Sequence, residues 1–284
     1  SALLNIVLDL VLIIAFHMGA AGAAVATVIS QGVSGLLCLL YIARKVPELR
    51  MRREDWRPSG DMLKIQLRIG LPMALQYSIT AIGTMMVQSS LNILGSTLVA
   101  AYTAAGKIEQ VITQAYVAMG TTIATYSAQN MGAGDVRRIR QGFRSITILG
   151  ILYSVIAAAF IMTAGKYMTY LFVSEDVGVI MDSVDIYLKC IGIFFIPLAV
   201  VNIYRNGIQG LGYGFLPMTA GIAELVGRGI VAVIAAEKRS YTGVCLAGPA
   251  AWVLAGSLLL VMYFYIMKKD IKKIFPENEK EYPN

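Results

Sequence analysis

The residues of this sequence best suited to ion chemistry lie inside apolar stretches. Asn5 and Asp9 are one helical turn apart and share a face in a helix, and Thr27 can reach the same depth from the next, antiparallel helix. A carboxylate, an amide oxygen and a hydroxyl are hard oxygen ligands that suit Na⁺, and a buried carboxylate also takes up a proton. We predict a cation site at Asn5, Asp9 and Thr27, while a structural hydrogen-bonded cluster fits the same residues equally well.

Other polar side chains interrupt the remaining apolar stretches. Glu224 and Arg228 are spaced for an ion pair on one helix face, and Glu109 lies deep in its stretch beside Lys107. A charge in the hydrocarbon region costs at least about 2.5 kcal/mol, so such residues persist where they pair, line water or serve transport. For Glu109, cavity lining and interhelical pairing both stay open. The candidate cavity-lining residues are Gln76, Tyr77, Glu109, Tyr204, Asn206, Glu224 and Arg228.

The sequence contains no recognisable catalytic constellation. Its single histidine, His17, stands at a loop edge, and the three cysteines have no paired spacing: Cys38, Cys190 and Cys245. A glycine-rich phosphate loop with a following lysine is also missing, which argues against ATP-driven pumping. We therefore expect no enzyme activity, no cofactor other than H⁺ or Na⁺ as coupling ion, and no metal other than Na⁺ at Asp9.

The composition indicates that most of the chain does not face water. Of its 284 residues, 57% are hydrophobic and 14% charged, with a mean hydropathy of +0.67, whereas soluble domains carry roughly 25% charged residues. A helix needs about 20 apolar residues to cross the ~30 Å hydrocarbon layer. We predict a partial span over 2–16 and whole spans over 20–43, 69–94, 98–127, 146–163, 186–204, 215–236 and 243–267.

Lys and Arg are concentrated in alternate loops. Loops 44–68, 131–145 and 205–214 and the tail from 268 carry 8, 4, 1 and 5 of them, and the intervening loops 17–19, 95–97, 164–185 and 237–242 carry 0, 0, 1 and 2. By the positive-inside rule the first group is cytoplasmic. We expect a multi-pass protein of the plasma (inner) membrane with a cytoplasmic C-terminus, and the net charge of +7 then needs no nucleic-acid partner.

An internal repeat accompanies the predicted spans. Four positions of the first two spans match positions near the end of the chain: Gly22 and Gly35 fall on Gly243 and Gly256 at an offset of 221, and Asn5 and Asp9 on Glu224 and Arg228 at an offset of 219. The identity is weak, so a chance match stays open. If the repeat is real, a six-span unit ends the chain, and the first repeat lacks four and a half spans, about 160 residues.

The expected fold class is all-α, a polytopic transmembrane helix bundle. The repeat divides it into the last two helices of a preceding lobe (1–43), a cytoplasmic inter-lobe linker (44–68), one complete six-helix lobe (69–268) and a cytoplasmic tail (269–284). The linker mixes both charge signs with Pro47, Trp56 and Pro58, which suits a partly amphipathic segment. An ordinary solvated loop fits these residues as well.

Short motifs run through the chain in a fixed order. They are Asn5-Ile-Val-Leu-Asp9, Gly22-Ala-Ala-Val-Ala-Thr27-Val-Ile-Ser-Gln31, Gly70-Leu-Pro72, Gln129-Asn-Met-Gly132-Ala-Gly-Asp135, Gln209-Gly-Leu-Gly212 and Gly243 with Ala251-Trp252. Together they resemble the MATE family, the multidrug and toxic compound extrusion transporters. That family has twelve spans in two six-helix lobes, so the resemblance implies that this chain holds spans five and six of the N-lobe and all of the C-lobe.

The resemblance also implies where the coupling ion binds. In the family an N-lobe cation site uses an Asn, an Asp and a Thr that match Asn5, Asp9 and Thr27. Its acidic residue on the first span and its Asn on the fourth lie outside this chain, so the site is incomplete here. Another branch carries acidic residues on spans seven and ten, and the corresponding stretches 72–80 and 195–202 contain none. This difference favours coupling through the N-lobe.

We therefore expect an antiporter that uses H⁺ or Na⁺ to export amphipathic, often cationic, drugs and other organic compounds. Its partners would be the lipid bilayer, its small-molecule substrates and the missing N-terminal part of the same protein. A flippase for lipid-linked oligosaccharides is the alternative. Flippases of that kind line their cavities with several cationic residues, and only Lys107 and Arg228 are available here. A purely structural subunit would leave Asp9 unexplained.

Overall fold

The computed structural model describes residues 1–47, 59–171 and 177–270, and every regular element within these ranges is a helix. The chain forms two compact units, Ser1–Leu63 and Lys64–Asn284. The boundary falls inside the predicted linker 44–68, of which residues 48–58, with Trp56 and Pro58, lie outside the described residues. Residues 60–68, also assigned to that linker, form the first turns of a helix instead. The predicted tail is described only as far as residue 270.

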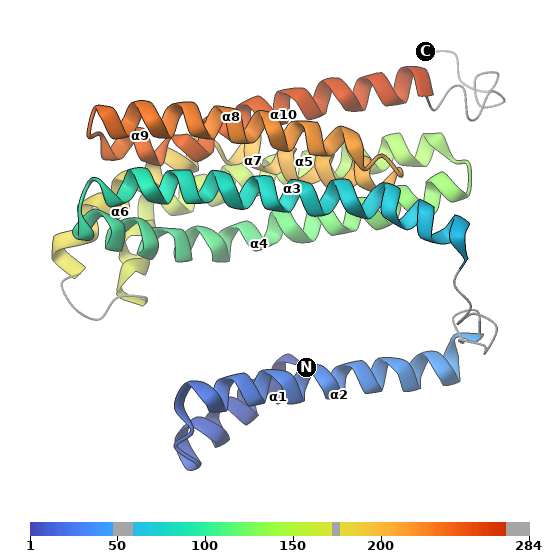
Figure 1. Cartoon of the computed structure of the whole chain (residues 1–284), viewed down its shortest axis with the longest axis horizontal. Helices are drawn as coiled ribbons and strands as arrows, with labels where there is room; N and C mark the ends of the chain where they lie inside the picture. The colour runs from blue at the N-terminus through green and yellow to red at the C-terminus, as the bar shows by residue number, and fades with distance from the viewer. Residues whose placement is uncertain (48–58, 172–176, 271–284) are drawn as a thin grey trace. The chain divides into compact units, whose positions relative to one another are not determined.

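The first unit contains a helical hairpin. Helix α1 (Ala2–Leu10) continues as a wider helical turn over Val11–Ala15, and α2 (Gly19–Lys45) returns alongside it (Figure 1). His17 and Gly19 make the reversal with φ angles of +53° and +54°. A Cβ atom on Gly22 would lie 3.2 Å from Cβ of Leu12, so the glycine lets the two helices approach closely near the reversal.

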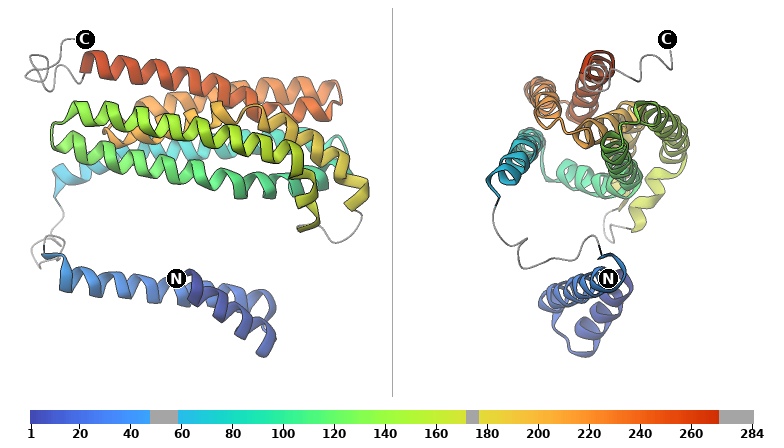
Figure 2. Two further views of the ribbon diagram at one scale, coloured as in Figure 1. Left: turned by 180° about the vertical axis from the view of Figure 1, so that it is seen from behind. Right: turned by 90° about the vertical axis from the view of Figure 1, so that its right-hand side faces the viewer.

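The second unit is a bundle of helices that run side by side. In chain order they are α3 (Gly60–Asn92), α4 (Ser96–Gly132), α5 (Val136–Ala164), α6 (Val177–Gly192), α7 (Phe195–Gly210), α8 (Phe215–Glu237), the short α9 (Tyr241–Cys245) and α10 (Ala247–Tyr265). Short helices of other types follow α5 at Gly165–Leu171 and α10 at Ile266–Asp270. The end-on view places α7 near the middle, and α7 packs against α4, α5 and α10 (Figure 2).

Large apolar side chains cover the outside of this bundle as well as its core. Tyr116, Phe143 and Phe195 are fully buried, while Ile156 and Phe264 are 68% and 65% exposed on the surface. An apolar exterior of this extent suits contact with hydrocarbon rather than water. Among the described residues, the helices long and apolar enough to cross a membrane are Gly19–Lys45, Val136–Tyr170, Phe215–Glu237 and Tyr241–Lys268. The bent pair Ile180–Gly192 and Phe195–Gly210 meets the same criterion when its two helices are taken together.

The other two predicted whole spans, 69–94 and 98–127, lie within α3 and α4. These helices have 33 and 37 residues, which is ample length, yet they do not meet the same apolar criterion. Polar side chains such as Gln76 and Glu109 interrupt them. Both helices nevertheless run along the apolar ones (Figure 2).

The predicted span over 186–204 is bent rather than continuous. Two helices, α6 and α7, cover this stretch and meet at an angle of 54°. Pro197 lies in the first turn of α7, where a residue without a backbone N–H is well tolerated, so the sequence supports a new helix start there. The assignment of Arg205 to a cytoplasmic loop is wrong, because α7 continues to Gly210 and therefore includes Arg205.

In the turn between α4 and α5, Asp135 caps the start of α5. Its side chain accepts a hydrogen bond from the backbone N–H of Arg138 at 2.9 Å, which satisfies one of the free donors at the start of α5. Gly134 just before it has a φ of +73°, a conformation that a residue without a Cβ adopts easily.

Replacing Gly210 with alanine will destabilise the bundle. A Cβ atom there would lie 2.3 Å from the carbonyl oxygen and 2.8 Å from the Cα of Ala124 on α4, and backbone atoms cannot turn aside. We expect a loss of about 1–3 kcal/mol, as for other overpacked interiors, seen as a lower melting temperature of the purified protein in detergent. Gly106→Ala on α4 is the control, because no described atom lies within 4 Å of its added Cβ. Equal melting temperatures for the two variants would contradict the prediction.

Candidate functional site

In the first unit, the structure places Asn5 and Asp9 on one half-buried face of α1. The Asn5 Nδ2 and Asp9 Oδ1 atoms are buried, and neither has a hydrogen-bond partner among the described residues. Thr27 lies on an exposed part of α2, and its hydroxyl donates to the carbonyl of Ala23 at 2.9 Å. That bond uses the hydroxyl hydrogen and leaves the oxygen able to accept. The described residues show no hydrogen bond from Thr27 to Asn5 or Asp9.

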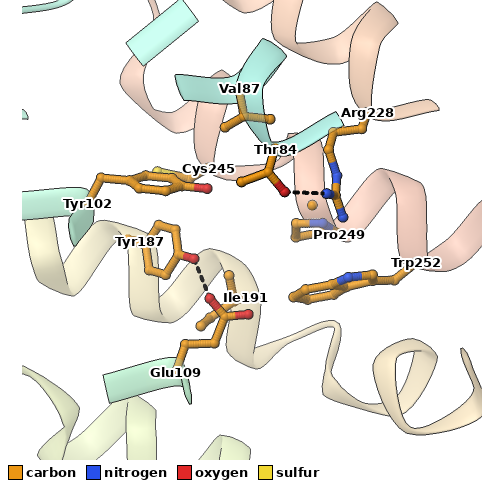
Figure 3. Close-up of a pocket in the computed structure, with 11 residues that line it drawn as sticks. Thr84, Val87, Tyr102, Glu109, Tyr187, Ile191, Arg228, Cys245, Pro249 and Trp252 are labelled. Atoms are coloured by element: carbon orange, nitrogen blue, oxygen red, sulfur yellow. Dashed lines mark hydrogen bonds between the residues drawn. The ribbon is translucent and has the colours of Figure 1, made fainter. Parts of the chain in front are cut away.

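In the second unit, a cavity of about 190 Å³ lies between the helices. Its walls come from α3, α4, α6, α8, α9 and α10, so residues from the beginning and the end of the unit meet around it. Figure 3 shows Glu109 and Arg228 pointing into it from opposite sides, with the Trp252 ring beside the space between them. Two charged side chains and several aromatic rings therefore line one cavity.

The Glu109 side of the cavity is organised by tyrosines. The Tyr187 hydroxyl donates a hydrogen bond to Glu109 Oε2 (Figure 3). Tyr102 packs edge-on against the Tyr187 ring with the ring centroids 4.7 Å apart. These contacts hold the Glu109 carboxylate at the cavity wall, and Lys107, two residues earlier, is exposed instead. Of the two alternatives for Glu109, the structure thus shows both cavity lining and an interhelical hydrogen bond.

The Arg228 side of the cavity is a network of charges. Arg228 Nη2 donates to Glu224 Oε1 at 2.8 Å, and Arg205 Nη2 donates to Glu224 Oε2 at 2.5 Å. Arg228 Nη1 also donates to the Thr84 hydroxyl at 3.4 Å. The predicted pair of Glu224 and Arg228 is therefore present, and Arg205 extends it. The network ties α7, α8 and α3 together.

The remaining candidate residues do not line this cavity. Gln76 is buried and accepts a hydrogen bond from Gln209 Nε2 at 3.1 Å, which links α3 to α7. Tyr204 is buried and accepts from the Thr147 hydroxyl at 3.3 Å. Asn206 donates to the Asn202 carbonyl of its own helix. Tyr77 is 69% exposed on the surface of the unit.

The sequence interpretation missed four residues that shape the cavity or its charges: Thr84, Tyr187, Arg205 and Trp252. The sequence contained a signal for Arg205. No turn-forming residue lies between Asn202 and Arg205, so the apolar helix can continue through Arg205. The signal for Trp252 was weaker, because this residue only formed part of the motif Gly243 with Ala251-Trp252. Tyr187 and Thr84 carried none, since only the packing of α6 and α3 turns them inward.

A helical bundle with an apolar exterior and a charged cavity inside has the architecture of a membrane transport protein. The MatE family model matches residues 69–234, more than half of the chain. The chain therefore belongs to the MATE family, whose members are multi-pass membrane transporters of multidrug efflux and not enzymes.

Individual relatives agree with this membership. The "Probable multidrug resistance protein YpnP" of Bacillus subtilis is 34% identical over 210 residues, 73% of this chain and 46% of the relative. The "Probable multidrug resistance protein NorM" of Thermotoga maritima is 27% identical over 219 residues, 76% of this chain and 47% of the relative. A crystal structure of MATE in complex with MaL6 shares the fold, with a TM-score of 0.87 at 24% identity, over 95% of this chain and 61% of that one.

The chain spans about half the length of the curated relatives that it matches.

Removing the charge of Glu224 will destabilise the second unit. Glu224→Gln leaves Arg205 and Arg228 without a counter-charge inside the bundle, and breaking a buried ion pair from one side costs about 3–5 kcal/mol. We expect a clearly lower melting temperature in detergent. The control is Asp185→Asn, which breaks the more exposed pair of Lys189 and Asp185, a type worth about 0–1 kcal/mol. Similar melting temperatures for both variants would count against the network.

Proposed function

We propose that the complete protein is a cation-coupled antiporter that exports amphipathic, often cationic, drugs and other organic compounds. The proposal places it in the plasma (inner) membrane as a multi-pass protein with a cytoplasmic C-terminus. The family membership supports it, as do the relatives named multidrug resistance proteins. These names do not favour the lipid-linked oligosaccharide flippase.

The observation that carries the coupling proposal is the state of Asn5 and Asp9. Their Nδ2 and Oδ1 atoms are buried without a hydrogen-bond partner in the described residues. Leaving a buried polar group unsatisfied costs about 1–3 kcal/mol. A proton on Asp9, or a Na⁺ held by oxygens of Asp9, Asn5 and Thr27, removes that penalty for Asp9 Oδ1. The site therefore has a reason to take up a cation.

Ion binding drives transport only if the ion favours one conformation. A proton or Na⁺ at Asp9 removes a bare negative charge from the apolar surroundings of α1, so it stabilises arrangements in which this face packs tightly. The empty carboxylate stabilises arrangements that admit water. A ligand with such unequal affinities shifts the population of the two conformations. Entry of the ion from outside and its release inside would then reset the transporter for export.

Replacing Asp9 with asparagine will abolish coupled export. Asp9→Asn keeps the size and polarity of the side chain but removes the charge that binds the ion. In everted membrane vesicles carrying the full-length protein, we expect gradient-driven transport of a fluorescent cationic dye to fall about tenfold or more, the effect of losing roughly 1.4 kcal/mol of coupling. Separate H⁺ and Na⁺ gradients identify the driving ion.

Two further variants make this experiment specific. Asp61→Asn removes an exposed carboxylate in the first turn of α3 and should leave export unchanged. Thr27→Val removes the third proposed ligand and should weaken Na⁺-driven export more than H⁺-driven export, because a proton needs only the carboxylate. Undiminished export by the Asp9→Asn protein under both gradients would refute the proposal.

A further inference from the structure

We propose that the cavity of the second unit is an anion site, in which Arg228 binds the carboxylate of a small aromatic organic acid. The inference deepens the proposed export function and rests on it, because it assigns a substrate class to this cavity. It differs from the expectation of cationic substrates, and it concerns residues remote in sequence from Asp9.

The first argument is the charge of the Arg228 side. Arg205 and Arg228 share the single carboxylate of Glu224, each using one of its oxygens. The group thus carries two positive charges and one negative charge, and Arg228 is its member that lines the cavity. Glu109 lies on the opposite wall, and no ion pair joins it to Arg228 among the described residues. The excess positive charge on the Arg228 side therefore has no contacting counter-ion in that part of the chain.

The second argument is the unused hydrogen-bonding capacity of Arg228. Its Nε atom is buried and has no hydrogen-bond partner in the part of the chain that the structure describes. Its Nη1 makes only a long contact, 3.4 Å, with the Thr84 hydroxyl. Arg228 also forms part of the cavity wall (Figure 3). A guanidinium with spare donors presents a planar fork that matches a carboxylate.

The weak internal repeat aligns Arg228 with Asp9 and Glu224 with Asn5 at the offset of 219. Both pairs lie on the first helix of a hairpin, and both contain a buried polar atom without a partner among the described residues. The sign of the unmatched charge is opposite in the two hairpins. If the Asp9 position attracts a cation, the same reasoning makes Arg228 attract an anion.

The other residues that line the cavity indicate the size and the aromatic character of the ligand. Trp252 and Tyr102 offer aromatic surface beside the space between Arg228 and Glu109 (Figure 3). A cavity of about 190 Å³ accommodates a compact aromatic group but not a large dye. Stacking against the rings contributes about 0.5–1.5 kcal/mol beyond burial. The chemistry that fits is a one- or two-ring aromatic carboxylate.

A matched series of ligands tests the sign of the charge. The probes are 2-naphthoate, 2-naphthamide and 2-naphthylmethylammonium, which share one ring system and differ in charge. Isothermal titration of each into the purified full-length protein gives the affinities. We expect naphthoate to bind about tenfold or more tightly than the amide, the effect of a charge-assisted hydrogen bond, and the ammonium compound to bind most weakly.

Variants locate the site. In Arg228→Gln the preference for naphthoate over the amide should vanish, and in Arg228→Lys part of it should remain. Arg205 still pairs with Glu224 in both proteins, and melting curves show whether each is folded. Lys107→Gln, which removes an exposed positive charge on α4, should keep the full preference.

Four results would overturn the inference: equal binding of acid and amide, tightest binding of the ammonium compound, a preference that survives in Arg228→Gln, or no binding of any probe at millimolar concentration. Binding is measured without an ion gradient, so it is independent of coupling. If dye export depends on Asp9 but naphthoate and the amide bind equally, the anion site is refuted and the proposed antiport stands. If naphthoate is preferred but dye export does not depend on Asp9, the proposed antiport is refuted and the anion site stands.

Discussion

Glu224 holds two arginines inside a bundle whose outer surface is apolar, and the arrangement of the cavity depends on that interaction. Arg205 comes from α7 and Arg228 from the same helix as Glu224, while Thr84 on α3 accepts from Arg228. Charges removed from water are stable only when they are paired and hydrogen-bonded. The three helices must therefore stay in register, and this register is what presents Arg228 at the cavity wall.

The break between α6 and α7 has a similar consequence for the opposite wall. Because α6 and α7 are bent by 54° at the break between them, α6 packs against α4 at Tyr187 while α7 runs through the middle of the bundle. Glycines let α7 approach its neighbours, as at Gly210 against the backbone of Ala124. A single straight helix would not bring Tyr187 to Glu109 and Arg205 to Glu224 at the same time.

Asp9 and Arg228, which the weak sequence repeat aligns, have charges of opposite sign. In the first unit, a carboxylate and an amide have buried atoms without partners in the described residues, and in the second unit the guanidinium of Arg228 does. A family of exporters needs an ion site and a substrate site that respond to one conformational change. Duplication followed by a change of charge would give each hairpin one of these tasks. The coupling of Asp9 and the ligand class at Arg228 would then be two results of the same geometry.

The sequence by itself determined the class of fold and the family resemblance, because a membrane helix is specified locally by the length of an apolar stretch and by the charges that flank it. It also indicated the ion pair of Glu224 and Arg228, which is a local feature of one helix face. The role of Arg205, the size of the bend before α7 and the inward direction of Tyr187, Thr84 and Trp252 were decided only by the tertiary structure. Each depends on which face of a helix meets which neighbour across many residues of chain, and an apolar pattern that surrounds a helix on all sides does not record that choice.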